Sequence, residues 1–330
     1  MFAKLKSKKS RIASELTASL YYASDVHGSE QCWRKFLGAG RFYGVGSLIM
    51  GGDLTGKAIV PITHGESDRY TATFLGEQKV AEGSEALDQL LKAVRYNGMY
   101  PWVATAAEIA GYRDDAEARE RLFDEVMLSE LGRWIGLADE RMAQYGIDVF
   151  VMAGNDDPWA CDAVIDAAEH VQSCDDRIVN VGPHEMISLS YANHTPWSSP
   201  RELDEDQLYV RIKRLADQLE DPASSIFNLH VPPYDSGLDR ANQINDDLTL
   251  VYRSGQPVEI PVGSTAVRQA IEEFQPLISL HGHIHESRGD TTIGRTVAIN
   301  SGSEYNSGRI HGVVVKLGRD EVLSHQFTIG

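Results

Sequence analysis

Short apolar runs that end in glycine or a polar residue recur along the chain. Runs of this length are typical of buried strands, whereas helices show longer stretches with apolar residues three or four positions apart. The runs predict buried strands at Leu20–Ser24, Ser47–Met50, Ile147–Met152, Ser225–Leu229 and Leu277–Leu280. After residue 290 the pattern again favours strands, at Thr291–Ile299, Ile310–Leu317 and Glu321–Thr328.

In the segments between these runs, the apolar residues are spaced as they are in amphipathic helices. The predicted helices are Glu85–Arg95, Ala116–Met142, Asp157–Glu169, Leu203–Leu219 and Thr265–Phe274. In the third helix we expect Asp157 to be the N-cap and Pro158 to take the first helical position. Strands that alternate with helices predict an α/β fold, to which the last part of the chain adds antiparallel strands.

Polar clusters follow the first five predicted strands. In open α/β sheets, ligands bind outside the carboxyl ends of the strands, so clusters from distant parts of the chain can converge there. The clustered residues are Asp25 and His27, Asp53 after two glycines, Asn155 after Gly154, His230, and His283 with His285 after Gly282. The order of the strands therefore predicts one shared site.

The seven clustered side chains are two aspartates, one asparagine and four histidines. Oxygen and imidazole ligands suit Mn, Fe, Zn, Co or Ni, and we expect manganese first. Seven ligands are too many for one catalytic metal, which keeps an open position, but they suit two divalent metal ions that share one carboxylate. Two-metal sites serve in-line displacement at phosphorus.

The ordered series Asp25-x-His27, Gly52-Asp53, Gly154-Asn155, His230 and Gly282-His283-x-His285 resembles the calcineurin-like metallophosphoesterase family. The resemblance implies a four-layer α/β/β/α sandwich with mixed sheets. It also implies that Asp25, His27 and His285 hold one metal, that Asn155, His230 and His283 hold the other, and that Asp53 bridges them. A hydroxide between the metals would then attack phosphorus in a phosphate monoester or diester.

One position departs from the commonest pattern of that family. Many members have a histidine after Gly-Asn, which helps to protonate the leaving group or stabilises the transition state. Here the residue is Asp156, which we take as a candidate catalytic residue in its place. Burial would raise the pKa of this carboxyl and favour the role, whereas two nearby cations would lower it.

Two segments are candidates for substrate recognition. The first is a helical insertion at about 58–146, within a single domain that spans residues 1–330. We expect either a lid over the metals, or added core packing or an oligomer contact. The second is Pro232–Pro261, in which Tyr234 and Asp235 are candidates for substrate contacts. The turn Asn300–Ser303 resembles one that the family places near the metals.

Each of these residues alone has an ordinary structural explanation: a buried histidine, a turn asparagine or an aspartate N-cap. Only the set points to metal. Lys57 could contact a phosphate or remain solvated, and His281 could support a neighbouring ligand. The remaining histidines are expected on the surface or in packing: His64, His170, His184, His194, His311 and His325.

The formal net charge of −17 opposes binding to nucleic acid, which depends on lysine and arginine. It permits a small phosphorylated substrate, because bound cations can reverse the local field. We therefore expect a metal-dependent phosphoric ester hydrolase. The alternatives are a nuclease of the same fold, and a non-catalytic metal-binding scaffold.

The remaining features favour a cytoplasmic protein. The sequence contains no apolar stretch long enough to predict a membrane span. The basic segment Met1–Arg11 is expected to be a solvated arm rather than a signal peptide, because no clean apolar run follows it. Cys32, Cys161 and Cys174 lack CxxC spacing, so we expect buried free thiols.

Overall fold

A six-stranded mixed sheet forms one half of the core in the computed structural model, which describes residues 16–113, 115–245 and 247–330. Its order is β22 (Val322–Ile329), β21 (His311–Leu317), β1 (Ala18–Ala23), β2 (Ser47–Met50), β7 (Asp148–Val151) and β8 (Val171–Ser173). Strands β1, β2, β7 and β8 are parallel, and β21 and β22 are antiparallel additions.

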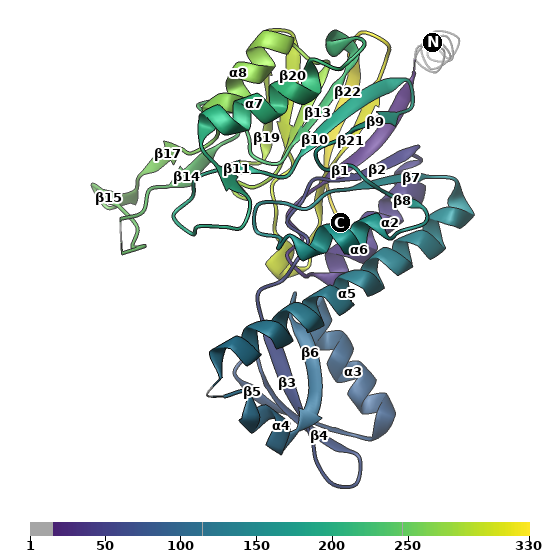
Figure 1. Ribbon diagram of the computed structural model, residues 1–330, viewed down its shortest axis with the longest axis vertical. Helices are drawn as coiled ribbons and strands as arrows, with labels where there is room; N and C mark the ends of the chain where they lie inside the picture. Colours follow the sequence, from purple (N-terminus) through teal and green to yellow (C-terminus); the bar gives the residue numbers. More distant parts are fainter. Residues whose placement is uncertain (1–15, 114, 246) are drawn as a thin grey trace, which may run out of the picture.

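A second six-stranded mixed sheet packs against the first (Figure 1). Its order is β19 (Gly289–Ile293), β20 (Thr296–Asn300), β18 (Ile278–His281), β13 (Ile226–Leu229), β10 (His184–Leu189) and β9 (Ile178–Val181). Alternate residues of the two sheets meet in one apolar cluster, where Leu20 and Tyr22 lie opposite Ile226 and Ile278. The two sheets are therefore the inner layers.

Helices cover both outer faces. On the first sheet lie α2 (Glu30–Tyr43), α5 (Ala116–Tyr145) and α6 (Ala160–Asp166), and on the second lie α7 (Glu205–Ala216) and α8 (Thr265–Phe274). The predicted fold class, a four-layer α/β/β/α sandwich with mixed sheets, is confirmed. Helix α2 was not predicted, although Ser29 caps it and its apolar residues have helical spacing.

The predicted cap of the third helix is wrong. Helix α6 begins at Ala160, not at Asp157, and Pro158 precedes it. The carboxylate of Asp157 instead accepts hydrogen bonds from the backbone N–H groups of Leu54 and Thr55, at 2.9 and 2.8 Å. This side chain links the loop after β7 to the loop after β2.

The sequence had suggested a helical insertion, but the insertion also contains strands. Between β2 and α5 it contains a four-stranded sheet and two helices (Figure 1). Its elements are β3 (Ile59–His64), β4 (Arg69–Phe74), β5 (Glu77–Glu82), α3 (Gly83–Tyr96), β6 (Tyr100–Thr105) and α4 (Ala106–Gly111). It projects from the sandwich and has an apolar cluster of its own, which includes Ile62, Phe74 and Val94.

Shorter elements complete the described chain. They are β11 (Ala192–Asn193) with β12 (Glu202–Leu203), β14 (Arg240–Asn242) with β17 (Glu259–Pro261), β15 (Tyr252–Arg253) with β16 (Gln256–Pro257), and the 3-10 turns Pro222–Ser224 and Tyr305–Ser307. The three cysteines are buried and unpaired, as predicted. Within the described ranges, no helix has the length and apolar character needed to cross a membrane. The basic arm at Met1–Arg11 lies outside the described residues.

Candidate metal centre

The seven predicted ligand residues converge at the carboxyl ends of strands from both sheets. Asp25 and His27 follow β1, Asp53 follows β2 and Asn155 follows β7 in the first sheet. His230 follows β13 in the second sheet, where β18 leads into the loop with His283 and His285. Parallel strands direct their carboxyl ends to one edge, so residues more than 250 positions apart become neighbours.

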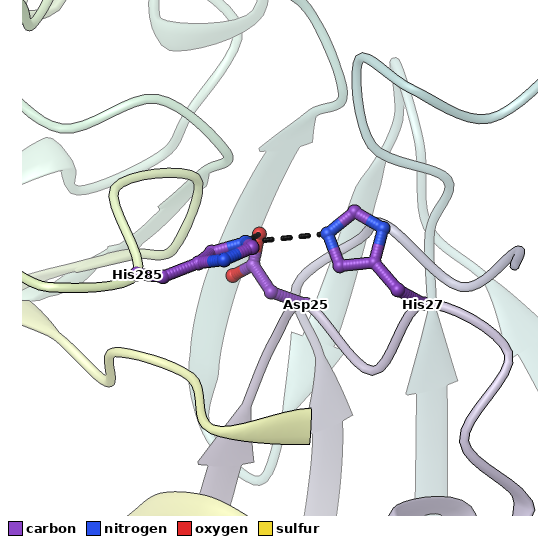
Figure 2. A group of neighbouring side chains, drawn as sticks. All are labelled: Asp25, His27 and His285. Atoms are coloured by element: carbon purple, nitrogen blue, oxygen red, sulfur yellow. Dashed lines mark hydrogen bonds and ion pairs between the residues drawn. The ribbon is translucent and has the colours of Figure 1, made fainter. Parts of the chain in front are cut away.

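Asp25, His27 and His285 form the first group (Figure 2). Nε2 of His285 lies 3.3 Å from Oδ1 of Asp25 and 3.2 Å from Nε2 of His27. Asp25 is completely buried, whereas the His285 side chain is 33% exposed. Two imidazole nitrogens and a carboxylate oxygen thus face a common point, as ligands of one ion would.

Asp53, His230 and His283 form the second group. Nε2 of His230 lies 3.4 Å from Oδ2 of Asp53 and 2.9 Å from Oδ1 of Asn155. The same Oδ2 of Asp53 lies 3.5 Å from Nε2 of His27 in the first group. Asp53 therefore stands between the two groups, where the resemblance had placed a bridging carboxylate.

The backbone is held in an uncommon conformation at four of these seven residues. The φ angles are 58° at Asp25, 37° at His27, 52° at Asp53 and 64° at His283. The left-handed region costs a non-glycine residue about 1 kcal/mol or more, and such strain gathers at functional sites. The N–H of His283 donates to both carboxylate oxygens of Asp25 at 3.0 Å, which helps to hold the turn.

Two glycines of the motifs allow the loops to approach this closely. A Cβ added at Gly154 would lie 2.1 Å from Oδ1 of Asp53, and one at Gly282 would lie 2.2 Å from Oδ2 of Asp25. Any larger residue would displace a candidate ligand. The Gly-Asn and Gly-His spacing is therefore a packing requirement of the site.

His230 gives a direct test of whether a cation fits. Its Nδ1 lies 2.8 Å from the backbone oxygen of Gly51, so this nitrogen carries a proton and donates it. Nε2 of the neutral ring is then an acceptor, yet it faces the oxygens of Asp53 and Asn155, which also accept. Such an arrangement needs a proton or a metal ion at its centre.

The close packing of these charged groups also shifts their pKa values. Burial alone would lower the pKa of His230, but the charge of Asp53 and its hydrogen bond raise it to about 10. Burial and the charge of His230 lower the pKa of His283 to about 4. Burial alone would raise the pKa of Asp25 and Asp53, but the surrounding histidines hold both below their usual range. These two carboxylates are thus ready to bind a cation.

Asp156 lies beside the two groups. Its backbone N–H donates to Oδ1 of Asp53 at 3.0 Å, and its carboxylate lies near His27 and Asp53. Its Oδ2 accepts a 2.5 Å hydrogen bond from Nζ of Lys57. Burial would lower the pKa of Lys57, but its contact with Asp156 raises it, so the ammonium keeps its charge at neutral pH.

A cavity of about 980 Å³ extends from the candidate ligands toward the β14–β17 hairpin. Tyr234 lines it, and its contact with a substrate stays a prediction. Asp235 is not among its lining residues, and its carboxylate is paired with Arg240 at 3.0 Å. Among the described lining residues, none comes from 58–146. The insertion thus contributes no wall to the cavity, which argues against the lid.

Sequence reasoning missed several residues that the cavity brings together. His194 and Trp197 come from the loop between β11 and β12, and Tyr305 packs on His27 with ring centres 4.7 Å apart. His194 had been expected on the surface or in packing, and its side chain is 64% exposed, but no spacing signal indicated that it also lines the cavity. The turn at Ser303 does lie at the site, because its hydroxyl donates to the backbone oxygen of Asp25 at 2.6 Å.

His281 has a packing role next to the site. It is completely buried, with Nδ1 2.7 Å from the backbone oxygen of Leu229 and Nε2 2.7 Å from the hydroxyl of Ser279. Burial lowers its pKa to about 4, so the ring is neutral. Its contacts support the strand that ends at His230.

Comparisons with known proteins agree with the fold and leave the family open. No protein-family model matches the chain. The uncharacterized protein MJ1162 of Methanocaldococcus jannaschii is 29% identical over 149 residues, which span 43% of this chain and 61% of that protein. TT1561 of Thermus thermophilus is 12% identical, with a TM-score of 0.51 over 95% of this chain and 98% of that one. Another crystal structure is 14% identical with a TM-score of 0.54, covering 95% and 98%. These structural similarities concern the fold alone.

Proposed function

We propose that this protein is a phosphoesterase that depends on two divalent metal ions and hydrolyses phosphate monoesters or diesters. The observation that carries the proposal is the position of Asp53, whose Oδ2 lies 3.5 Å from a histidine of one group and 3.4 Å from a histidine of the other. A carboxylate shared between two ligand groups is the arrangement that a two-metal site needs.

In this proposal Asp25, His27 and His285 hold one ion, and Asn155, His230 and His283 hold the other. Bound metal ions would supply Lewis acidity and a nucleophilic water at neutral pH. The protein's own part is to orient the ligands. The Gly51 carbonyl fixes the His230 ring, and the hydroxyl of Ser199, which accepts from Nδ2 of Asn155 at 2.8 Å, turns the amide oxygen toward the site.

The cavity favours a small organic phosphate as the substrate. A cavity of about 980 Å³ is much larger than a phosphate group needs, so the ester has room for a sizeable organic part. Its described lining includes one lysine and no arginine. A groove for a nucleic acid backbone carries several such residues, so the cavity does not favour a nuclease. Buried free thiols fit the proposed cytoplasmic location.

The test is hydrolysis of p-nitrophenyl phosphate and bis-p-nitrophenyl phosphate by the purified protein, with Mn²⁺ and with a chelator. We expect turnover that disappears on chelation and returns with metal, and the ratio of the two rates would define the ester class. Tight metal binding with no turnover of a broader phosphoester panel would overturn the proposal in favour of a scaffold.

A further inference from the structure

Lys57 is the one lysine or arginine among the described residues that line the cavity. Its Nζ lies 2.5 Å from Oδ2 of Asp156, and the two side chains are 67% and 19% exposed. Asp156 belongs to a cluster with His27 and Asp53, whose ligand atoms all lie within 4.8 Å of one another. The ammonium is therefore held beside the candidate metal ligands while it remains open to the cavity.

The surrounding structure fixes both members of this ion pair. Asp157, which is completely buried, accepts from the N–H and the hydroxyl of Thr55 at 2.8 and 2.6 Å. The N–H of Gly56 donates to the hydroxyl of Tyr100 at 2.6 Å. The Thr55 bonds join the segment just before Lys57 to the residue just after Asp156, and the Gly56 bond ties the same segment to β6. The ion pair is thus built on two loops that are clamped together rather than on free surface chains.

The charges around Asp156 explain why such a pair is useful. An unpaired carboxylate next to Asp53 would repel an anionic phosphoester. Lys57 neutralises it, and a lysine has three N–H donors, of which Asp156 takes one. The other donors of this ammonium can reach an oxygen of a phosphoryl group in the cavity.

We propose that Lys57 binds a phosphoryl oxygen of the substrate and that Asp156 is the positioning residue that holds its ammonium in place. The inference rests on the proposed phosphoesterase function and assigns the anion contact of that site. In this arrangement Asp156 acts through Lys57 and is not itself a metal ligand.

The effect of Asp156→Asn on phosphate binding separates positioning from simple electrostatics. If the carboxylate acted only through its charge, its removal would tighten the binding of an anion. If it positions Lys57, its removal frees the long side chain and weakens binding. We expect Asp156→Asn and Lys57→Met each to weaken the binding of inorganic phosphate about tenfold or more, and Lys57→Arg to retain part of it. The combined variant should lose little beyond either single change.

The measurement is calorimetric titration of inorganic phosphate into the manganese-loaded protein, with bound metal and thermal unfolding determined for each variant. Glu77→Gln and Lys79→Met remove an ion pair of the same type in the insertion and should change nothing. Asp156→Ser is a second variant, should Asp156→Asn fail to fold.

Tighter or unchanged phosphate binding in Asp156→Asn would overturn the positioning role. Loss of bound metal in that variant would also overturn it, because Asp156 would then be a ligand. Unchanged binding in Lys57→Met would remove Lys57 from the anion contact, even if hydrolysis by the wild-type protein had already supported the proposed function. Failure of the wild-type protein both to bind phosphate and to hydrolyse esters would contradict the function itself.

Discussion

The candidate metal centre and the inserted sheet are stabilised in opposite ways. At the centre, carboxylates and imidazoles are buried together, and Asp25 and Asp53 adopt strained backbone angles. In the insertion, apolar side chains such as Ile62 and Phe74 are buried behind an exposed polar face. The centre thus gathers groups that could hold a cation, whereas the insertion carries a conventional apolar core. Stability and chemistry are therefore separable in this molecule, and changes to one region should leave the other intact.

The largest expected effect is on activity at the centre. Replacing Asp53 with asparagine keeps the shape but removes the carboxylate charge between the two ligand groups. We expect kcat/KM for p-nitrophenyl phosphate to fall at least about 10³-fold, with loss of bound metal and little change in the melting temperature. Metal analysis, kinetics and circular dichroism measure the three quantities.

Asp235→Asn is the matched control, because the Asp235 side chain is 58% exposed and pairs with Arg240 away from the cavity lining. It should leave activity and metal content unchanged. Full turnover by Asp53→Asn with confirmed loss of metal would end the two-metal interpretation.

A change in the core of the insertion should have the reverse outcome. Phe74 is 5% exposed, and Phe74→Ala should cost about 3–5 kcal/mol of local stability through the cavity that it leaves. Because no described residue of 58–146 lines the cavity at the candidate metal centre, the proposed hydrolysis should persist. Hydrogen exchange should rise in β3 to β6 and stay slow in the two large sheets.

Val80→Ala in the same small sheet is the control for that change, since Val80 is 52% exposed and should tolerate truncation. Parallel loss of activity and of insertion stability in Phe74→Ala would show that the two regions are coupled, and the separation argued above would be wrong.

The convergence of the candidate ligands could be predicted from sequence, because these residue types recur at fixed places after strands. Asp25 with His27, and His283 with His285, are each separated by one residue directly after a strand. The strained φ angles and the pairing of Lys57 with Asp156 left no such pattern. They depend on how distant loops meet, which local spacing does not encode.

The insertion was harder to predict for a different reason. Strand β5 reads EQKVAE, so its apolar content is far below that of a buried run. It lies at the edge of the small sheet, where only one face is covered. Helices α3 and α5 were found because their apolar residues recur at helical spacing over several turns, whereas β5, which precedes α3, is too polar to stand out.

The smallest effect concerns a chain of ion pairs between the sandwich and the insertion. Glu30, at the start of α2, is 4% exposed and pairs with Arg34 and with Arg133 of α5. Arg133 also contacts Glu130, which binds Arg95 of the insertion. Glu30→Gln should lower the free energy of unfolding at pH 7 by about 1–3 kcal/mol. We expect a value toward the lower end of this range, because Arg133 keeps its ion pair with Glu130 in the variant.

The pH dependence of this loss tests its electrostatic origin. Burial alone would raise the pKa of Glu30, but its hydrogen bonds from Arg133 and Arg34 hold it below the usual value. Its stabilisation is therefore complete above the unfolded pKa of about 4.3 and is lost as the pH falls through the lower folded value. In urea unfolding, the difference in the free energy of unfolding between wild type and Glu30→Gln should shrink in acid.

The exposed pair of Glu117 with Arg121, also on α5, provides Glu117→Gln as a control, which should show no such difference at either pH. A gap of equal size at pH 7 and in acid would assign the effect to packing, and the ion pairs would then not link the insertion to the sandwich.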